Sequence, residues 1–521
     1  MEYKLYDVSR THTNTKKEGF FVKKFKKAMA LSLALAMGLS LVACGDKAEE
    51  TTEATTEATT EAAVDDATDD ASADDADTAS NDDSGYTTSN DGKVLYIQGW
   101  NTEFVTRLKD HYPDFVTADD YDKMIEEGTD ADNNVTVDGE IGKIGDITIK
   151  FKSTPNKDNA YQDNLDSKLP GNVDAAADDK IDLFLVEADY ALKYVDTDYT
   201  VPVSALGIDE SELSNQYQYT KDIVTDSNGN LKGVSWQGCP GVLIYNRDAA
   251  KEVLGSDDPA DVQKAVADWD TYNETAAKMK DAGYKMTATA NDTFRVFSNN
   301  VSTPWVVDDQ INIDDNIKKW VDMSKEQVDN GYTTTEELWS DAWNQGFYPD
   351  GKVFCYFGPA WLINFSMKAD DSASIAANGG WGATEGPQGF YWGGTWICAA
   401  NGTDNADLVA DIMRTLTTDE DVMTEIVKAD NDFVNNKPAM EAAATDDSYA
   451  FAVLGGQNPL DKFCAGADKI DLSNISAYDQ GCCEEFQTAM KGYFDGNYET
   501  YEDALDAFYT AIGEKYPELA Q

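Results

Sequence analysis

Short apolar runs and amphipathic stretches follow one another along the middle of the chain. The runs at 93–100, 146–154 and 181–195 have the alternation of strands, and helical spacing of apolar residues follows the first two. The third run continues from a strand into a helix. Strands that alternate with helices in this order predict a parallel sheet with crossover helices. Ligands of such sheets bind at the carboxyl ends of the strands, which lie at 100–103 and 187–190.

The alternation of strands and helices continues to the end of the chain. The runs at 241–253 and 351–365 pass from a strand into a helix, and at least two helices follow Asn474. The stretch at 116–146 is an acidic excursion that is rich in Gly and Asn. We predict an α/β protein, and residues 93–521 are too many for one compact core, so we expect two lobes.

Residues 1–43 have the pattern of a bacterial signal peptide. The lysine-rich stretch Lys16–Lys27 precedes the apolar run Ala28–Ala43, which is shorter than the roughly 20 apolar residues of a membrane span. The run ends in Leu41-Val42-Ala43-Cys44-Gly45, which resembles the lipobox of bacterial lipoproteins. The resemblance implies that Cys44 is lipidated and anchors the mature protein to the cell membrane, facing the extracellular side. The alternative is an ordinary signal peptide with a chance Cys.

Residues 44–92 consist of Thr/Glu/Ala repeats followed by clusters of Asp, Ala, Ser and Thr. Such a segment cannot bury enough apolar surface to offset its chain entropy, and its like charges keep it extended. We therefore predict a disordered tether between the membrane and the folded part. An acidic binding tail is the alternative.

The formal net charge of the chain is −56. Such a surface repels nucleic acid and anionic lipid, so we expect no nucleic-acid partner. Only two histidines occur, His12 and His111, and His12 lies in the signal peptide. This scarcity excludes a site with several histidine ligands and catalysis that needs a spare histidine base. We predict no catalytic residues, no metal site and no cofactor, and we leave a structural disulfide open.

Six segments in order resemble the extracellular solute-binding proteins of ABC importers, in the family that includes maltose- and oligosaccharide-binding proteins. These segments are VLYIQGW (94–100), IDLFLVEADYA (181–191), GVLIYNRDAAK (241–251), WSDAWNQGFYPDGKVFCYFGPAWLINF (339–365), WGGTWICAANGTDNADLVADIMRTLTTDED (392–421) and FVNNKPAMEAA (433–443). The resemblance covers most of the chain after residue 93, and the acidic stretch at 116–146 departs from the family pattern.

The resemblance implies a two-lobed periplasmic-binding-protein-like (type II) α/β fold. The chain would cross between the lobes near 236–243, 392–398 and 455–475. The predicted first lobe comprises 93–236 and 390–455, and the second lobe comprises 237–389 and 456–521. The ligand would lie in the cleft between lobes that close by hinge bending, and the closed form would dock on the permease.

A sugar offers a CH face to aromatic rings and hydroxyl groups to carboxylates and amides. A sugar site is therefore expected where aromatic residues stand beside acids and amides at the predicted strand ends and crossings. The candidate ligand-binding residues are Trp100, Asn101, Glu103, Glu187, Asp189, Trp236, Gln237, Trp361, Trp392, Trp396 and Tyr478. Each tryptophan has core or hinge packing as its alternative role, and each acid has that of a solvated loop residue.

The other tryptophans are harder to place. Trp269 and Trp320 lie on amphipathic helices, so we expect them in the core. Trp305, Trp339 and Trp343 stay undecided between the core and the cleft.

The sequence predicts the substrate-binding component of an ABC importer, a monomer that captures a sugar or oligosaccharide and delivers it to membrane permease subunits. Two alternatives stay open: a lipid-anchored glycoside hydrolase that uses two carboxylates, and a sensor that presents the ligand to a membrane receptor. The tryptophan content favours saccharides over amino acids, whose carboxylate calls for an arginine. Only Arg107, Arg247, Arg295 and Arg414 lie beyond the signal peptide. The excess of acids leaves a cationic ligand open.

Overall fold

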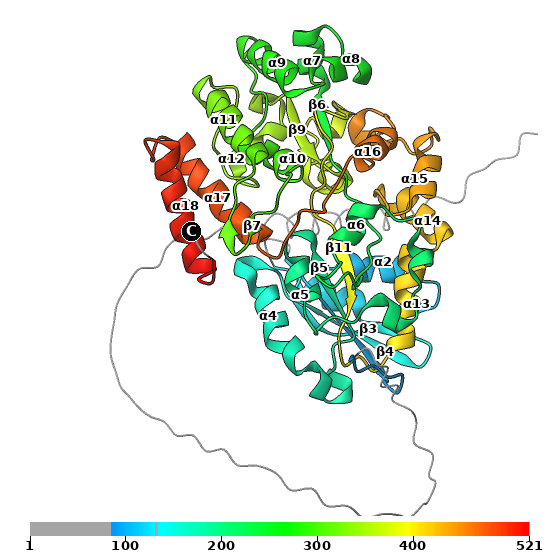
Figure 1. Cartoon of the computed structure of the whole chain (residues 1–521). Helices are drawn as coiled ribbons and strands as arrows, with labels where there is room; N and C mark the ends of the chain where they lie inside the picture. The colour runs from blue at the N-terminus through cyan, green and yellow to red at the C-terminus, as the bar shows by residue number, and fades with distance from the viewer. Residues whose placement is uncertain (1–84, 131–133, 520–521) are drawn as a thin grey trace, which may run out of the picture.

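The computed structural model describes residues 85–130 and 134–519, and it shows two lobes that are each built on their own sheet (Figure 1). The first sheet has the strand order β11-β5-β1-β4-β3-β2, and the second has β10-β6-β9. The strands of the first sheet are β1 (Val94–Gly99), β2 (Phe115–Thr117), β3 (Val137–Ile144), β4 (Ile147–Ser153), β5 (Leu183–Glu187) and β11 (Thr395–Ala399). The others are β6 (Val242–Asn246), β9 (Cys355–Gly358) and β10 (Trp381–Thr384), with β7 (Val306–Val307) and β8 (Gln310–Ile311) as a separate ribbon.

The centre of the first sheet is parallel, which confirms the prediction from the alternation. β1 pairs in parallel with β4 on one side and β5 on the other. Leu95 and Ile97 of β1 are fully buried, as expected for a parallel strand whose two faces are both covered. The helices of this lobe are α2 (Glu103–His111), α3 (Tyr121–Gly128), α4 (Ala160–Lys168), α5 (Ala191–Val195), α6 (Gln218–Asp222), α13 (Ala406–Thr417) and α14 (Glu420–Asp430).

The described residues of the acidic stretch at 116–146, which we identified as an excursion, include regular elements. It contains α3 and β3, and β3 pairs antiparallel with β4 while β2 pairs antiparallel with β3. Ile141 and Ile144 of β3 are buried, whereas Asp138 and Glu140 are exposed. An antiparallel strand needs only one apolar face, so an acidic composition is compatible with a strand here.

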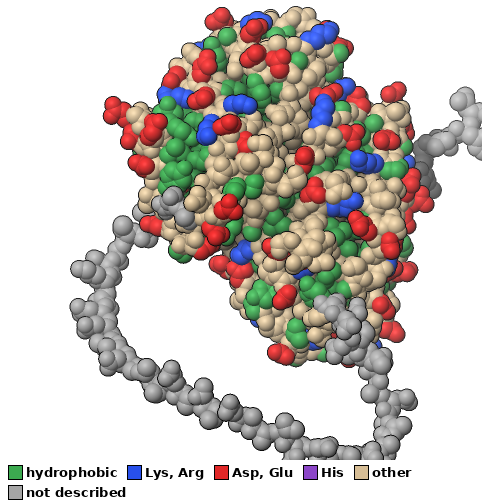
Figure 2. All heavy atoms as spheres, in the orientation of Figure 1, with side chains coloured by type: hydrophobic (Ala, Val, Ile, Leu, Met, Phe, Trp, Pro, Cys, Tyr) green, Lys and Arg blue, Asp and Glu red, His purple; other side chains and the backbone are tan. Residues whose placement is uncertain are grey.

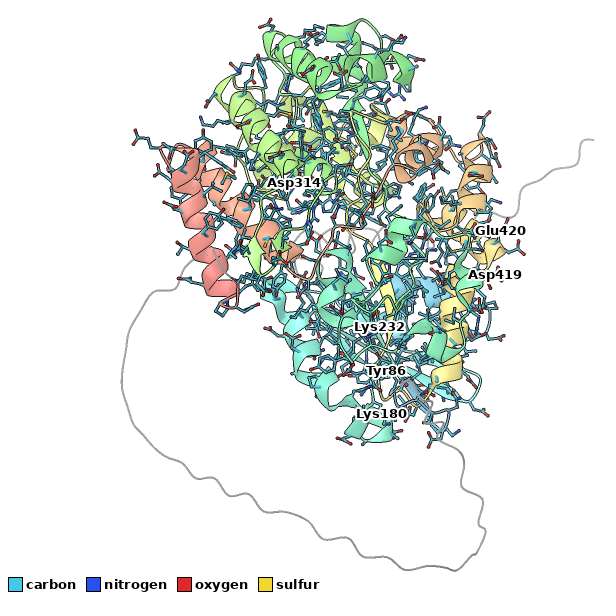
Figure 3. All side chains as sticks on the ribbon, viewed as in Figure 1. Tyr86, Lys180, Lys232, Asp314, Asp419 and Glu420 are labelled. Atoms are coloured by element: carbon cyan, nitrogen blue, oxygen red, sulfur yellow. The ribbon has the colours of Figure 1, made fainter. Side chains whose placement is uncertain are left out.

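Residues 85–92, which we assigned to the tether, pack on the first lobe instead. The backbone N–H of Ser89 donates to the carbonyl of Thr403 at 3.0 Å, in the loop after β11. The ammonium of Lys232 lies 5.4 Å from the centre of the Tyr86 ring, and Figure 3 labels both residues. These contacts make the last eight residues of the predicted tether part of the folded lobe.

The signal peptide 1–43, Cys44 and the tether up to residue 84 lie outside the described residues, so their roles stay predictions. Within 85–130 and 134–519, no helix combines the length and the apolar character that a membrane crossing needs. The six cysteines in these ranges are all unpaired, which answers the open question about a disulfide.

Helices surround the second sheet in the other lobe (Figure 1). They are α7 (Arg247–Leu254), α8 (Pro259–Ala265), α9 (Trp269–Asp281), α10 (Phe294–Ser298), α11 (Asp315–Asp329) and α12 (Asp341–Asn344). Side-chain caps begin several of them: the Asn246 side chain accepts the N–H of Asp248 at 3.0 Å at the start of α7. Trp320 on α11 is fully buried, and Trp269 on α9 is half-buried and stacks 4.4 Å from Phe297. Both tryptophans therefore pack inside the lobe, as expected.

The chain ends in four helices, which are α15 (Lys437–Ala444), α16 (Leu460–Ala467), α17 (Asp479–Phe494) and α18 (Tyr501–Lys515). α17 and α18 pack against α11 through a separate apolar cluster that contains Trp305, Trp320 and Phe486. Figure 1 shows this pair of helices along one side of the molecule. The C-terminal pair therefore belongs to the second lobe.

Three segments link the lobes and run side by side. The first two, near 234–241 and 390–395, lie where we expected them and are bridged to each other between Pro240 and Tyr391. The third differs from our expectation of 455–475, because it passes at 432–436, where Gln237 bridges Val434.

The position of the third crossing moves one predicted lobe boundary. Residues 437–455, which we assigned to the first lobe, lie beyond that crossing. The segment that follows them contacts β10, since the Gln457 side chain donates to the carbonyl of Ala383 at 2.8 Å. The other lobe boundaries stay predictions.

Candidate functional site

The parallel strands of the first sheet end side by side at one edge. β1 ends opposite Ser153, the last residue of β4, and β5 ends at Glu187, opposite Thr395 of β11. Because these strands are neighbours, the segments at 100–103 and 187–190 form one wall. The second crossing enters β11 at the same wall.

The second lobe faces this wall and contacts the first lobe at two places, at the wall and near the end of α14. At one, the guanidinium of Arg295 on α10 donates two hydrogen bonds to the carboxylate of Asp189, and both side chains are 13% exposed. At the other, Asn364 Nδ2 donates to the carbonyl of Asn431 at 2.8 Å, just after α14. The two lobes are therefore in direct contact across the cleft. Asp189, a predicted ligand residue, takes part in that contact.

A pocket lies between the lobes where η4 (Ala188–Tyr190), α10 and the start of α17 meet. It is partly open to solvent. Asp189 and Arg295 line it, together with Tyr391 of the second crossing and Asp479 of α17. The C-terminal helices therefore contribute polar groups to the site.

Three tryptophans of the second lobe and the second crossing pack together. The Trp361 and Trp392 rings are 5.2 Å apart, and Trp339 lies 5.5 Å from Trp392. The indole N–H of Trp361 donates to the carbonyl of Trp392 at 2.9 Å. Trp361 and Trp392 are buried, whereas Trp339 is half-buried. The Trp339 ring is therefore the member of the group that still reaches solvent.

The backbone of Trp339 is strained. Its φ angle is +70°, in a region that bulky residues rarely occupy. Such strain costs of order 1–3 kcal/mol and gathers at ligand clamps and active sites.

Trp100 forms a second aromatic group with two tyrosines on the first lobe. Its ring lies 5.5 Å from Tyr161 and 6.2 Å from Tyr190, and the three side chains are buried. The Tyr161 hydroxyl donates to the carbonyl of Leu185 at 2.7 Å, which holds the group against β5. Trp100 is therefore fixed at the strand end where we predicted it.

Several buried donors at these strand ends and crossings have no hydrogen-bond partner within the described part of the chain. They are Asn101 Nδ2, Tyr190 OH, Trp236 Nε1, Trp339 Nε1 and Trp392 Nε1. A buried donor without a partner costs about 1–3 kcal/mol, so such groups are rare and call for an explanation. Others, such as those of Tyr272 and Trp381, lie inside the second lobe.

A buried hydrogen-bond network ties the crossings to α2. Gln237 Nε2 donates to Glu103 at 2.7 Å and to Asp432 at 3.1 Å. Gln237 Oε1 accepts the backbone N–H of Thr395 at 3.1 Å. One side chain therefore joins all three crossings to the first lobe.

Arg107 neutralises the acids of this network. Its guanidinium lies 3.0 Å from Asp430, 3.6 Å from Asp432 and 3.7 Å from Glu103. Burial raises the pKa of the Glu103 carboxyl to about 7, against the opposing effect of the Arg107 charge, and nearby Asp432 and Asp430 add to the rise. His111 also bonds to Asp430 at 3.0 Å.

The raised pKa of Glu103 gives the stability of the protein a pH dependence. A group whose pKa is higher in the folded state stabilises the fold below its ordinary pKa of about 4.5, and this contribution is lost as the pH rises toward 7. In Glu103→Gln the contribution is absent. We therefore expect the unfolding free energy of the variant, relative to the wild type, to rise by roughly 1–3 kcal/mol between pH 4.5 and 8. Urea unfolding across this pH range measures the difference.

Glu212→Gln is the control for that measurement. Glu212 is exposed at the surface, and its hydrogen bond from Arg414 lowers its pKa, so its contribution is lost only as the pH falls below the ordinary value. The difference in unfolding free energy between Glu212→Gln and the wild type should stay constant between pH 5 and 8. A flat difference for Glu103→Gln as well would contradict the prediction.

The structure brings together six of the eleven predicted ligand residues at the wall and in the tryptophan group. They are Trp100, Asn101, Glu187, Asp189, Trp361 and Trp392. Trp236 lies beside them at the first crossing, where its ring packs 5.9 Å from Phe104. Ligand contact by these residues stays a prediction.

The other four predicted residues have different surroundings. The side chains of Glu103 and Gln237 hydrogen-bond to each other within the buried network that joins the crossings to α2. Trp396 is buried in the first lobe and its indole N–H donates to the carbonyl of Thr220 at 2.8 Å, so the structure places it in the core. Tyr478 packs edge-on against Tyr516 of α18 at 5.1 Å. Each of these four side chains contacts residues that the sequence pattern did not predict as its neighbours.

The structure also reveals site residues that we did not predict. Arg295 and Asp479 line the pocket, and Tyr190 and Trp339 carry unpartnered donors. Tyr190 follows the third predicted strand, and its position alone could have identified it. Arg295 lies in a helix with no distinguishing pattern, so no local signal was available.

Residues 140–453, more than half of the chain, match the family model of bacterial extracellular solute-binding proteins. No curated protein matches the chain.

Several solved structures have the same fold. A protein described as extracellular solute-binding protein family 1 is 20% identical, and the match covers 80% of this chain and 99% of that one, with a TM-score of 0.63. The galacto-N-biose/lacto-N-biose I-binding protein of an ABC transporter from Bifidobacterium longum, in complex with lacto-N-biose, is 15% identical over 83% and 100% of the two chains, with a TM-score of 0.57. The sugar-binding protein MalE from Xanthomonas citri is 13% identical over 81% and 98%, also with a TM-score of 0.57. At these identities the likeness shows the two-lobed fold.

Proposed function

Because this chain belongs to the bacterial extracellular solute-binding proteins, we propose that it captures a sugar or an oligosaccharide between its lobes and delivers it to the permease of an ABC importer. The capture is reversible and no group of the protein does chemistry on the solute. The protein acts as a monomer whose lobes close around the ligand by bending at the three crossings.

One observation carries the proposal, namely the unpartnered donors beside aromatic rings. Asn101, Tyr190 and Trp392 each bury a donor without a partner in the described ranges. Trp339 adds a partly exposed indole ring beside them. Sugar hydroxyl groups accept hydrogen bonds from such donors while the CH face of the ring packs on indole. The pattern therefore fits a saccharide better than an apolar solute.

The solved structures with this fold support the same class of solute. One of them holds lacto-N-biose, and another is described as a sugar-binding protein. Their identity to this chain is low, so they support the class and leave the particular sugar to experiment.

Membrane anchoring through Cys44 is part of the proposal. Its support is the lipobox-like ending of the apolar run, Leu41-Val42-Ala43-Cys44-Gly45. A receptor tied to the membrane that holds its permease docks at a raised effective concentration. Mass spectrometry of the mature protein tests this part, with an acylated N-terminal cysteine as the expected finding.

A thermal-shift screen against mono- and oligosaccharides tests the binding function. A saccharide at 100 times its dissociation constant should add about 2.7 kcal/mol of stability. The best ligand is then titrated by calorimetry into Trp392→Phe and Tyr190→Phe. Each variant removes one unpartnered donor and keeps most of the ring, so we expect its affinity to fall about 3–10-fold.

Trp381→Phe and Tyr272→Phe are matched controls. Both residues also bury a donor without a partner in the described ranges, but they do so inside the second lobe. Their affinities should stay within about twofold of the wild type. If no saccharide stabilises the protein, or if oligosaccharides yield new reducing ends on incubation, the proposed function is wrong.

A further inference from the structure

We propose that the solute is an amino sugar, and that Asp479 and Tyr391 bind its protonated amine in the pocket between the lobes. This inference rests on the proposed function and narrows it to one class of saccharide.

Carboxylates outnumber cations around the pocket. Asp189 and Asp479 line it, and Glu187 lies two residues from Asp189 at the end of β5. The cation beside them is Arg295, which already makes a two-pronged pair with Asp189. The paired charges cancel, and burial holds the pKa of Glu187 well above its ordinary value, so Asp479 is left as the excess negative charge at pH 7. A cationic ligand would balance this excess, whereas a neutral ligand would not.

The lysine on the C-terminal helices does not change this balance. Lys515 of α18 pairs with Glu484 at 2.9 Å and Glu485 at 3.6 Å. Its charge is therefore already matched on the outer side of α17. The pocket keeps its negative excess when the neighbouring helices are included.

Asp479 has a carboxylate oxygen free for a ligand. Its Oδ1 accepts hydrogen bonds from the backbone N–H and the hydroxyl of Ser476, at 2.8 and 2.7 Å. Its Oδ2 accepts none within the described ranges. The two bonds fix the direction of the side chain, so its second oxygen is preorganised as an acceptor.

Tyr391 provides a second polar group in the same pocket. Its side chain is buried to 4% exposure and lines the pocket, and its hydroxyl makes no hydrogen bond to any described residue. Asp189, Glu187 and Asp479 all act on this hydroxyl electrostatically and raise its pKa, with burial as the larger cause. The neutral hydroxyl oxygen can accept a hydrogen bond from an ammonium group, and the ring offers a π face to the same charge.

The ionised form of Asp479 favours the same class of ligand. Burial raises its pKa to about 6, the charge of Asp189 adds to the rise, and Arg295 opposes it. A bound ammonium favours the ionised carboxylate. Amine binding should therefore weaken as the pH falls below about 6, since the free site is then protonated. The ionisable groups that face Asp479 are Asp189, Arg295 and Tyr391 across the pocket and Cys482 and Cys483 on its own helix.

Three disaccharides with the same ring skeleton test the inference. The β-1,4-linked disaccharide of glucosamine carries amines, its N-acetylated counterpart carries neutral amides, and the glucose disaccharide carries hydroxyl groups. Calorimetry at pH 7 should show the amine form binding at least about 10-fold more tightly than both neutral forms, as expected for a charge-assisted hydrogen bond.

Asp479→Asn tests the residue assignment. We expect it to lower the affinity for the amine form about 10-fold or more and to leave the neutral forms within about twofold. Asp314→Asn is the matched control. Asp314 also accepts the N–H and the hydroxyl of a serine, Ser302, at 2.9 and 2.7 Å, but it does not line the pocket. Figure 3 labels it on the second lobe.

The outcomes separate the two proposals. If neutral saccharides bind and the amine form binds no more tightly, the amino-sugar inference is overturned and the proposed function stands. If the amine form binds best but Asp479→Asn does not weaken it, the assignment of Asp479 is overturned. If no saccharide binds, both proposals fail.

Discussion

Arg107→Met is expected to lower the free energy of unfolding by about 3–5 kcal/mol, the range for removing one partner of a buried ion pair. The guanidinium is buried among Glu103, Asp430 and Asp432. Methionine fills a similar volume but carries no charge, so the three carboxylates would be left close together at low exposure. Urea unfolding at pH 7 measures the loss.

Arg414→Met is the control for this variant. Arg414 pairs with Glu212 at 2.7 Å, and both side chains are about one-third exposed. Exposed pairs contribute about 0–1 kcal/mol. The loss from Arg107→Met should also shrink as the pH falls, because protonated carboxyls no longer repel one another. Equal losses in the two variants would contradict the role that we assign to the buried network.

Trp361→Ala is expected to weaken binding of the best saccharide by about 30-fold or more, as is typical when a central aromatic contact is removed. Trp361 holds the tryptophan group together, since its ring lies 5.2 Å from Trp392 and 6.0 Å from Trp339. Its N–H also donates to the Trp392 carbonyl. Removing the indole frees both neighbouring rings, so the stacking surface is no longer preorganised. Calorimetric titration measures the affinity.

The control for lost packing is Trp305→Ala. Trp305 is buried in the C-terminal apolar cluster, 5.4 Å from Phe486, and its loss should destabilise the fold by about 3–5 kcal/mol. The affinity of Trp305→Ala for the saccharide should nevertheless stay within about twofold of the wild type, because the C-terminal apolar cluster is separate from the tryptophan group. If both variants lose affinity equally, Trp361 acts through stability alone.

The carboxylates on the surface and those in the pocket differ in their effect on a ligand. Asp and Glu side chains are spread over both lobes on the visible face (Figure 2), where solvent screens them and their positions carry little information. The carboxylates of Asp189 and Asp479 lie between the lobes, where burial strengthens their effect on a ligand. Composition reveals the first group, and only the fold reveals the second.

Most of the architecture was predictable from the spacing of apolar residues. The parallel strands β1, β4 and β5 are visible in the chain, because local periodicity depends on residues a few positions apart. The two lobes followed from the length of the chain, and the first two crossings followed from the family resemblance. The third crossing was misplaced, since 432–436 is a short polar segment without the apolar run of a strand. Residues 85–92 were misassigned for a different reason, because backbone hydrogen bonds to a loop far along the chain hold them in place.

By itself, the sequence determined the order of strands and helices, the edge at which strand ends gather, and a family resemblance. Only the tertiary structure decided which side chains share that edge. Arg295 reaches Asp189 across 106 residues of chain, Gln237 joins all three crossings, and Trp396 turns into the core although its neighbour Trp392 lies at the site. The physical reason is that these pairings depend on which segments the lobes bring together, and no local pattern records that choice.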